Sequence, residues 1–498
     1  MKKLLSTKFL PLVLCVVLLC TLFSGCGEAN SGKVVVCFDI ATGGKGANAS
    51  YQEAVTGFLN WIDDCHKYLG LSISSEDIEV EVIPGSEEEP AARAGALQKI
   101  RAEIMAGKGP DVFICKTFGD AFHSKHPGGA EFDPMDGGRV FPYVEKSMNS
   151  GMFLPLDDLL SQFSLTDPDD LISGVLEGGK NQAGEQVVLP LTITVPILMF
   201  TGDDLPECGF EGTSWSDVLK GDDPVLREMS VWAMSYQRDA YWGGDERYLK
   251  NYVRVGSHSS GLSYLFPQMA DFKEERPYFT EEELFQTITA SIDAYRKTLE
   301  QETDQNSASV YITDIDTSDA GADLRFFPSV VNTPYTFVPL RNMTGGSTAI
   351  ATAYCAVNAN TKQKDKAREV LDALLCKDHK SGGRLYRIFN GMAVSRDLSA
   401  MGSSITYSGG AHFSGKELET WQRVCDDINS VRFLSPLDTE LNAMMEDVED
   451  AMHTERSPYD PDYIMRDGQF INYTVTDEEI RAIISEHYQN MQRLLDES

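Results

Sequence analysis

Residues 97–116 read LQKIRAEIMAGKGPDVFICK, and this stretch decides the expected fold. Leu97, Ile100 and Ile104 recur at helical spacing, which predicts a helix with one apolar face. We expect the helix to end at Gly107, because glycine commonly closes a helix. The β-branched and aromatic run 112–114 then predicts a buried strand.

The preceding segment repeats this alternation of strand and helix. Residues 34–38 form a β-branched run that predicts a buried first strand. Ser50 and Glu53 have capping-box spacing, which predicts a helix start at Ser50. Residues 78–82 alternate apolar residues with glutamate and predict a half-exposed strand near a sheet edge. This β-α-β-α-β order predicts an α/β fold, with a parallel sheet and helices on its faces.

Later helices carry clear start signals. Thr280 with Glu283, and Thr476 with Glu479, have capping-box spacing ahead of apolar stripes. A third amphipathic helix is predicted to start at Pro436. Two stretches interrupt the pattern: 119–153 is rich in Gly, Pro, His and Asp, and 302–324 is rich in Ser, Thr and Asp. Neither has calcium-loop spacing, and both are interpreted as solvated surface loops.

Composition limits the function. The chain has 498 residues, enough for two to four domains, and 42% of them are apolar, which allows a sizeable core. Lys and Arg number 43 against 76 Asp and Glu, so the formal charge is −33. A surplus of acid this large argues against nucleic-acid binding, which needs a basic surface, and against electrostatic docking on an anionic membrane.

The first 25 residues are interpreted as a targeting segment. Lys2, Lys3 and Lys8 precede the apolar run 9–22, which is short for a membrane span. Small residues then precede Cys26, as in a bacterial lipobox, although phenylalanine stands where leucine is usual. This pattern predicts cleavage before Cys26 and lipidation of its thiol; the alternative is an ordinary secretory signal. The mature chain would have 473 residues, and losing three lysines would take its formal charge to −36.

Cysteine usage indicates no redox or zinc motif, because no C-x-x-C pair is present. After cleavage seven cysteines remain besides the lipidated one: Cys37, Cys65, Cys115, Cys208, Cys355, Cys376 and Cys425. Several lie in apolar runs, so we expect mostly buried thiols and at most one or two disulfides.

Motifs of catalysis are also missing. The chain has no Gly-x-Ser-x-Gly elbow, no His-Glu-x-x-His helix and no phosphate-binding loop. Paired carboxylates of a glycoside hydrolase stay open as an alternative, because 76 acidic residues offer many pairs and single out none. We therefore expect a protein that is not an enzyme and that needs no cofactor or metal.

Five segments, in order along the chain, resemble the extracellular solute-binding proteins of bacterial ABC importers, in particular the carbohydrate-type group that includes the maltodextrin-binding protein. They are the segments 104–113, 151–157, 189–205, 214–219 and 339–375. The first has the group's order of helix, Ala-Gly, Pro-Asp-Val and strand. In the third, Met199-Phe200-Thr201 replaces the usual Tyr-Tyr-Asn.

The resemblance implies a two-lobed periplasmic-binding-protein-like fold of type II with a hinge between the lobes. The expected division is a signal peptide 1–25, a lipidated tether 26–33, a first lobe of 34–197 plus 335–392, and a second lobe of 198–334 plus 393–498. Ligand would lie between the lobes, at the carboxyl ends of the strands.

The implied function is to bind a small solute and deliver it to ABC permease subunits in the membrane. The resemblance favours an oligosaccharide, bound by a monomer anchored through Cys26 to the outer face of the cytoplasmic membrane. Alternatives are a lipid-anchored surface glycan hydrolase and a sensory or adhesive lipoprotein. The acid surplus disfavours an anionic ligand unless Arg or Lys side chains gather at the site.

Candidate ligand-binding residues lie in the loops after the first and third strands, on the strand that crosses between lobes, and in an aromatic pair of the second lobe. They are Asp39, Thr42, Thr117, Phe118, Asp120, Thr192, Thr194, Tyr241 and Trp242.

Overall fold

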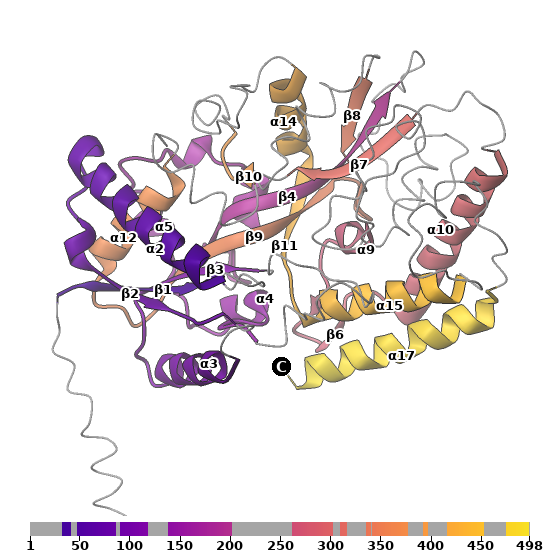
Figure 1. The fold of residues 1–498 in the computed structure, drawn as a ribbon, viewed down its shortest axis with the longest axis horizontal. Helices are drawn as coiled ribbons and strands as arrows, with labels where there is room; N and C mark the ends of the chain where they lie inside the picture. Colours follow the sequence, from indigo (N-terminus) through magenta and orange to yellow (C-terminus); the bar gives the residue numbers. More distant parts are fainter. Residues whose placement is uncertain are drawn as a thin grey trace, which may run out of the picture.

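The computed structural model describes residues 32–40, 47–85, 90–117, 138–201, 261–301, 309–315, 335–339, 341–376, 392–396, 416–452 and 475–497. These residues form a mixed nine-stranded sheet surrounded by helices (Figure 1). The main path of the sheet runs β10 (Met392–Ala393), β4 (Val188–Thr201), β9 (Ser347–Val357), β3 (Val112–Lys116), β1 (Val34–Asp39) and β2 (Ile78–Val82). Three further strands pair beside it: β7 (Ser309–Ile315) and β8 (Tyr335–Pro339) with β4, and β11 (Ile428–Phe433) with β9.

The N-terminal part has the predicted topology. Strand β1 pairs in parallel with both β2 and β3, and β2 lies at the edge of the sheet. The connections are helices α2 (Ala47–Asp64) and α3 (Pro90–Met105). Gly107 follows α3 with φ of +69°, the left-handed conformation expected of a residue that closes a helix. The predicted α/β class is therefore confirmed.

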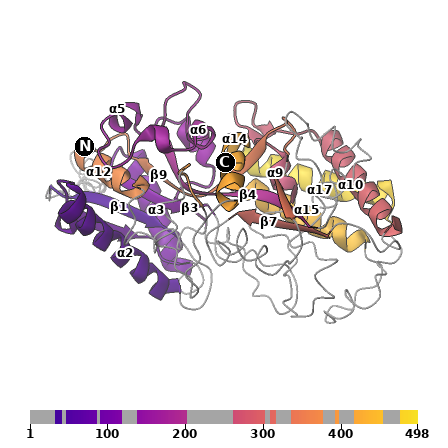
Figure 2. The ribbon, with the colours of Figure 1, turned by 90° about the horizontal axis from the view of Figure 1, so that it is seen from above.

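The other helices extend the structure on both sides of the sheet. They are η1 (Cys65–Leu69), α4 (Val144–Met148), α5 (Asp157–Leu160), α6 (Ser173–Glu177), α9 (Gly261–Leu265), α10 (Glu281–Gln301), α12 (Lys364–Leu375), α14 (Lys416–Asp427), α15 (Pro436–Met452) and α17 (Asp477–Asp496). Short pieces complete the set: η2 (Ser75–Asp77), η3 (Pro168–Asp170) and the hairpin of β5 (Ala270–Asp271) and β6 (Arg276–Pro277). Seen from above, α2 and α12 lie at one end of the molecule and α10 and α17 at the other (Figure 2).

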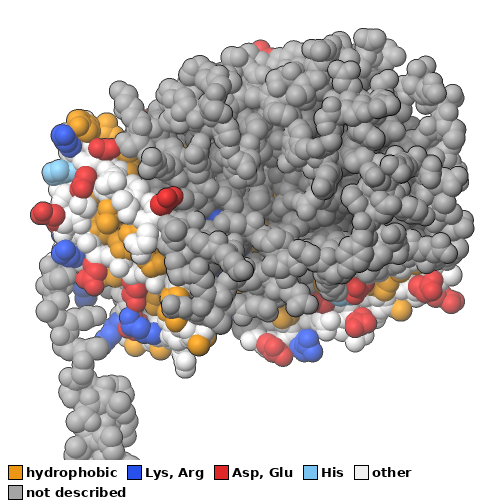
Figure 3. Space-filling model, in the orientation of Figure 1, with side chains coloured by type: hydrophobic (Ala, Val, Ile, Leu, Met, Phe, Trp, Pro, Cys, Tyr) orange, Lys and Arg blue, Asp and Glu red, His pale blue; other side chains and the backbone are white. Residues whose placement is uncertain are grey.

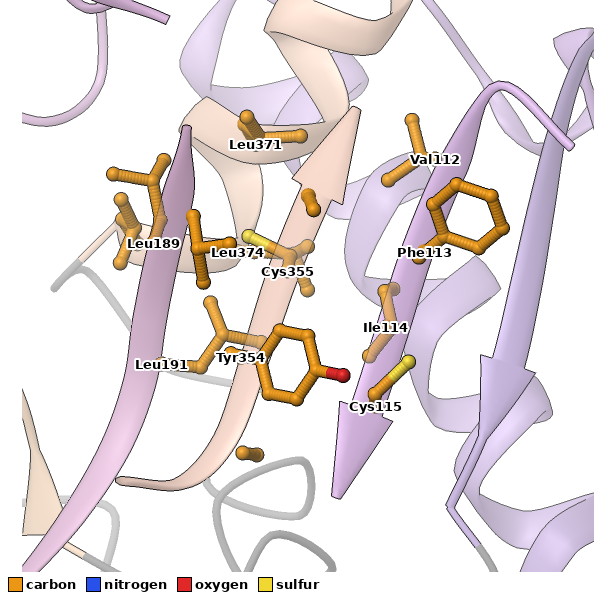
Figure 4. Packing of buried hydrophobic residues seen from close by; sticks show 14 of the residues in the cluster. Val112, Phe113, Ile114, Cys115, Leu189, Leu191, Tyr354, Cys355, Leu371 and Leu374 are labelled. Atoms are coloured by element: carbon orange, nitrogen blue, oxygen red, sulfur yellow. The ribbon is translucent and has the colours of Figure 1, made fainter. Parts of the chain in front are cut away.

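Two separate hydrophobic cores underlie this division. The first includes Phe38, Phe58 and Phe113, and its centre joins strands β3, β4 and β9 to helix α12 (Figure 4). The second is built from α9, α10, α15 and α17 and includes Leu284 and Ile484. The predicted two-lobed arrangement agrees with these two cores. Among the described residues, the chain passes from the first core to the second at 433–434. Tyr143 and Ile350 also pack in the second core, although their neighbours along the chain pack in the first.

The cysteines follow the prediction of buried thiols. Six buried cysteine thiols occur among the described residues: Cys37, Cys65, Cys115, Cys355, Cys376 and Cys425. Burial raises the pKa of Cys425 to about 12 and raises those of Cys37 and Cys115 as well. In Figure 4 the Tyr354 hydroxyl is directed toward Cys115, and burial raises the pKa of Tyr354 too. Cys37, Cys115 and Cys425 are therefore packing residues, because burial strongly disfavours their thiolate forms.

Three predicted helix starts are confirmed and one is wrong. Helix α15 begins at Pro436, as predicted. Thr280 and Thr476 each exchange hydrogen bonds with the glutamate three residues on. Ser50, by contrast, lies inside α2, which already includes Ala47. A Ser-x-x-Glu spacing also occurs within helices, so the pattern alone does not fix a start.

Both predicted surface loops need correction. In the first, residues 138–153 are described, and the side chains of Phe141 and Phe153 are buried and stack edge to face, with ring centroids 4.8 Å apart. In the second, residues 309–315 form β7, which pairs antiparallel with β4. The polar composition of both segments led to the prediction of loops. A few buried rings in the first and backbone pairing in the second are sufficient to give them a defined structure.

Candidate functional site

Asp39, the last residue of β1, lies at the carboxyl end of the parallel strands, where open α/β sheets present ligand sites. Its side chain is buried. One carboxylate oxygen accepts from the Arg93 guanidinium at 2.7 Å, and the other accepts from the Val140 backbone N–H at 2.9 Å. Both oxygens are engaged, so Asp39 ties β1 to α3 and to the segment around Val140. Its predicted ligand contact stays a prediction.

Arg93 is the partner that the sequence analysis missed. It is 2% exposed, and its guanidinium also donates to the carbonyl oxygens of Pro84 at 2.9 Å and Gly138 at 2.8 Å. A signal for it exists in the sequence: Arg93 precedes Leu97 and Ile100 by four and seven residues, so it shares their apolar helix face. A charge at such a position indicates a buried partner.

More cations lie beside this pair. Arg139 is buried, and its guanidinium donates to the Lys116 carbonyl oxygen. Burial lowers the pKa of Arg139 to about 10; Asp39 opposes the shift and Arg93 adds to it. Arg101 donates to the Val140 carbonyl oxygen at 3.3 Å, and burial lowers its pKa also. Among the described residues, the end of β1 and β3 therefore gathers more positive than negative side chains, contrary to the acidic balance of the whole chain.

Thr117 directly follows β3, and its side chain and backbone both form hydrogen bonds to β9. Its hydroxyl donates to the Ala351 carbonyl oxygen, and its backbone N–H donates to the Thr352 carbonyl oxygen at 2.9 Å. Thr117 is 2% exposed. It joins the end of β3 to the middle of β9, and its role toward a ligand stays a prediction.

Thr192 and Thr194 lie on β4, in the stretch of that strand that pairs with β9. The Thr192 hydroxyl lies 2.6 Å from that of Thr352. The pairing of β4 with β9 is irregular beside Pro190, which has no N–H to donate. The buried hydroxyl oxygen of Thr194 has no hydrogen-bond partner. Of the predicted residues that the structure describes, Thr194 is thus the one with unused hydrogen-bonding capacity.

The remaining predicted residues lie outside the described parts of the chain. They are Thr42, Phe118, Asp120, Tyr241, Trp242 and the lipidation residue Cys26.

A polar network fixes the junction where β9 and β11 begin side by side. The Asn342 amide donates to the Asn429 side chain at 2.8 Å and to the Thr348 hydroxyl at 3.0 Å. Its oxygen accepts from the Thr344 backbone N–H at 2.9 Å. Gly346 is required beside it, because an added Cβ would lie 2.3 Å from the Asn429 side chain. The network's bonds are internal, so it positions strands rather than presenting free groups.

Metal and membrane features were sought over the same residues. Within the described ranges, no group of three or more His, Cys, Asp or Glu side chains could hold a metal ion. The described helices include none long and apolar enough to cross a membrane. Figure 3 shows Asp and Glu side chains along the lower rim of the described surface, over α17.

Comparisons with known proteins give likenesses at the level of structure. No family model matches the chain, and no curated protein matches it either. Among solved structures, the chain is similar to an extracellular solute-binding protein family 1 member from Alicyclobacillus acidocaldarius (TM-score 0.49, 12% identity, 92% of this chain and 98% of that one). It is also similar to a de novo designed cysteine esterase (0.47, 13%, 93% and 99%) and to the cyclic alpha-maltosyl-1,6-maltose binding protein from Arthrobacter globiformis (0.45, 12%, 94% and 99%). Likenesses of this size assign neither a ligand nor an activity.

Proposed function

We propose that the protein is the substrate-binding component of an ABC importer, which holds a small solute between two lobes and delivers it to a membrane permease. The observation that carries this proposal is the pair of separate hydrophobic cores, which the described chain links at 433–434 and through single residues such as Tyr143 and Ile350. Such a construction favours hinge motion, because a few linking residues can rotate while each core stays packed.

The lobes are proposed to divide as the sequence suggests, with 34–197 plus 335–392 in the first and 198–334 plus 393–498 in the second, except at the last boundary. Cys425 and Phe433 pack in the first core and Leu434 in the second, so we propose that this boundary lies at 433–434. The proposal also keeps the lipid anchor at Cys26, a location on the outer face of the cytoplasmic membrane, and a monomeric state. The acidic rim over α17 fits a protein held in solution by charge at the end of a tether.

The proposed ligand is an oligosaccharide. Buried threonine hydroxyls at the sheet's centre support a ligand rich in hydroxyl groups, and Thr194 has a hydroxyl without a partner. The cations around Arg139 weaken the expectation of a strictly neutral ligand, since they offset the acidic field locally. Saccharides that carry carboxylates therefore belong in the test beside neutral ones.

A thermal-shift screen of the full chain against neutral and uronic-acid oligosaccharides tests this proposal. A ligand at 100 times its Kd should stabilise the protein by about 2.7 kcal/mol and raise the unfolding midpoint by several degrees. If peptides or polyamines raised the midpoint and no saccharide did, the sugar assignment would be wrong.

A matched pair of variants makes the screen specific to the site. Thr194→Val removes a hydroxyl that has no partner, so the free protein should lose no stability while the ligand-induced shift shrinks. Thr192→Val removes a hydroxyl bonded to Thr352, so it should destabilise the free protein by about 1 kcal/mol. Equal ligand shifts in Thr194→Val and the unmodified protein would remove Thr194 from the site.

The alternative functions differ in what happens to the bound saccharide. A glycan hydrolase would consume the saccharide, whereas a binding protein returns it unchanged. Chromatography of each stabilising saccharide after prolonged incubation separates the two, and shortened chains would favour the hydrolase. Saturable binding without any dependent uptake by cells would favour the sensory or adhesive lipoprotein.

A further inference from the structure

The amino ends of β1, β2 and β3 lie at one end of the sheet, because these three strands run parallel. Helices α2 and α3 return between the strands on opposite sides of the sheet, so both helices finish at this end as well (Figure 1). Strand β9 runs antiparallel to β3 and also finishes here, ahead of α12. We call the loops and helix ends gathered here, residues 32–33, 63–77, 105–111 and 358–366, the amino end.

Hydrogen bonds join the separate segments of the amino end. The Asp111 carboxylate accepts from the Thr361 hydroxyl at 2.5 Å. The Lys366 ammonium donates to the Gly32 carbonyl oxygen at 2.6 Å and pairs with the Asp77 carboxylate at 2.8 Å. All four segments are therefore held together as one surface.

Lysines outnumber acidic residues among the exposed side chains of the amino end. The exposed lysines are Lys33, Lys67, Lys108, Lys362 and Lys364, and the exposed acidic residues are Asp63, Glu76 and Asp365. The whole chain has the opposite balance, with 43 Lys and Arg against 76 Asp and Glu. Exposed acid returns beside β4, at Glu185, so the basic surface is local to β1, β2 and β3.

Two large apolar side chains are exposed on the same surface. Met105 is 89% exposed where α3 ends, and Tyr68 is 67% exposed shortly after α2. The Lys67 ammonium lies 4.7 Å from the centre of the Tyr68 ring. Figure 3 shows exposed apolar side chains together with Lys and Arg, and some Asp and Glu, at this left end of the described surface. Tyrosine and lysine beside an exposed apolar side chain are typical of surfaces that meet lipid headgroups.

The proposed anchor is attached at the same end. Gly32, which bonds to Lys366, follows Cys26 by only six residues. Six residues of chain span about 20 Å when fully extended. A lipid on Cys26 would therefore hold the amino end within reach of the membrane surface.

We propose that the amino end docks on the anionic phospholipid headgroups of the membrane that holds the anchor. Its lysines would contact the headgroup phosphates, and Met105 and Tyr68 would enter the boundary between headgroups and acyl chains. The proposal rests on the anchor at Cys26 put forward above. The acid surplus of the whole chain opposes docking only weakly here, because salt screens charges that lie farther than about 8 Å away.

Docking through the amino end would leave the ligand site open to the medium. The carboxyl ends of β1 and β3, where ligand binding is proposed, lie at the opposite end of these strands. Protein docked in this way would take up solute from the medium and would have to turn before delivering it to a permease.

The test measures which part of the anchored protein touches lipid. The full chain is purified from cell membranes and reconstituted on vesicles of phosphatidylcholine, alone or mixed with phosphatidylglycerol. A fluorescent label is placed on Ala106→Cys, at the amino end, or on Gln489→Cys, at an exposed position of α17, and quenchers are attached to the lipid. On anionic vesicles the label at 106 should be quenched more strongly than the label at 489, and high salt should remove the difference. The unmodified protein, treated with the same label, supplies the background from other thiols.

Charge-reversal variants identify the lysines as the cause. Lys108→Glu combined with Lys364→Glu should bring quenching at 106 down to that at 489, because each lysine lost weakens attraction to an anionic surface about fivefold. Lys273→Glu combined with Arg493→Glu makes the same change in net charge at exposed positions beside the second core, and should leave quenching at 106 unchanged. Circular dichroism checks that all variants are folded.

Flotation of the protein with the vesicles separates this proposal from the anchor. Protein that floats with both kinds of vesicle but shows equal quenching at 106 and 489 would overturn the docking surface and leave the anchor in place. Protein that floats only with anionic vesicles, with the label at 106 quenched, would support the docking surface and reject the anchor. Flotation with neither kind, or a quenching difference that survives the lysine reversals, would overturn the docking surface. The thermal-shift screen in solution judges saccharide binding independently of all these outcomes.

Discussion

For single residues near the strand ends, the sequence predicts where a side chain lies but not which residue it contacts. Asp39 stands directly after a buried strand, and that position suggests a ligand contact. Its carboxylate is instead shared between Arg93 and the Val140 N–H. The position of Asp39 could be inferred from the sequence, but its partner lies 54 residues away and was brought to it by the packing of α3.

The Asp39–Arg93 pair gives the first prediction. Asp39→Asn should destabilise the protein by about 3–5 kcal/mol, because it leaves the buried guanidinium without a counter-charge. Urea unfolding followed by circular dichroism measures the change. Asp158→Asn, at an exposed position of α5, is the matched control and should change stability by less than about 0.5 kcal/mol. A small loss for both variants would contradict the structural role of Asp39.

Two glycines give a contrasting prediction. At Gly179 an added Cβ would lie 1.9 Å from the Val188 carbonyl oxygen, so Gly179→Ala should destabilise the protein by more than about 3 kcal/mol. At Gly57, inside α2, nothing lies within 4 Å, so Gly57→Ala should stabilise it by about 0.5–1 kcal/mol. Thermal unfolding midpoints compare the two variants, and a shift of the same sign in both would contradict this close approach.

At the scale of elements, α15 and α17 are joined by a polar clamp on His487. The ring nitrogen atoms lie 2.7 Å from Glu440 and 3.0 Å from Asp447. Burial of the ring opposes its protonation, but the hydrogen bonds and charges of the two carboxylates outweigh burial and raise the pKa of His487 above 6.5. Burial likewise opposes ionisation of Glu440, but hydrogen bonds from His487 and Asn490 lower its pKa below 4.5.

The contacts of His487 with Glu440 and Asp447 are expected to stabilise the protein only within a limited range of pH. A raised histidine pKa contributes stability that is fully present below 6.5 and is lost as the pH rises through the folded value. A lowered glutamate pKa contributes stability that is present above 4.5 and is lost as the pH falls. The difference in unfolding free energy between the unmodified protein and His487→Gln should therefore be larger at pH 5.5 than at pH 8.5. A difference independent of pH would show that His487 stays neutral.

Local sequence signals predicted elements better than they predicted loops. The capping boxes at Thr280 and Thr476 form within four residues, so no distant contact is needed. The strand at 309–315 and the buried ring of Phe141 depend on β4 and on Phe113, and both partners are far away in the chain. Composition averages over such segments and misses the few residues that pack.

For the whole molecule, the proposed anchor makes the fourth prediction. Cys26→Ala should move the protein from the membrane fraction to the medium or the soluble fraction, because the lipid can no longer be attached. Immunoblots of fractionated cells measure the distribution, and Cys20→Ala, inside the proposed signal, is the control. Retention of Cys26→Ala on membranes at the level of the control would favour a protein held there by other means.

The sequence by itself determined the α/β class, the parallel pairing of the first three strands, the helix starts at Thr280, Pro436 and Thr476, and the buried thiols. These follow from short-range periodicity and from hydrophobicity, which act over a few residues. Only the tertiary structure decided that Arg93 pairs with Asp39 and that Thr194 has an unpartnered hydroxyl. It also decided that Glu145 accepts a hydrogen bond from Phe433, where β11 ends. Each of these depends on which distant segments share a core, and long-range packing rather than local pattern selects those neighbours.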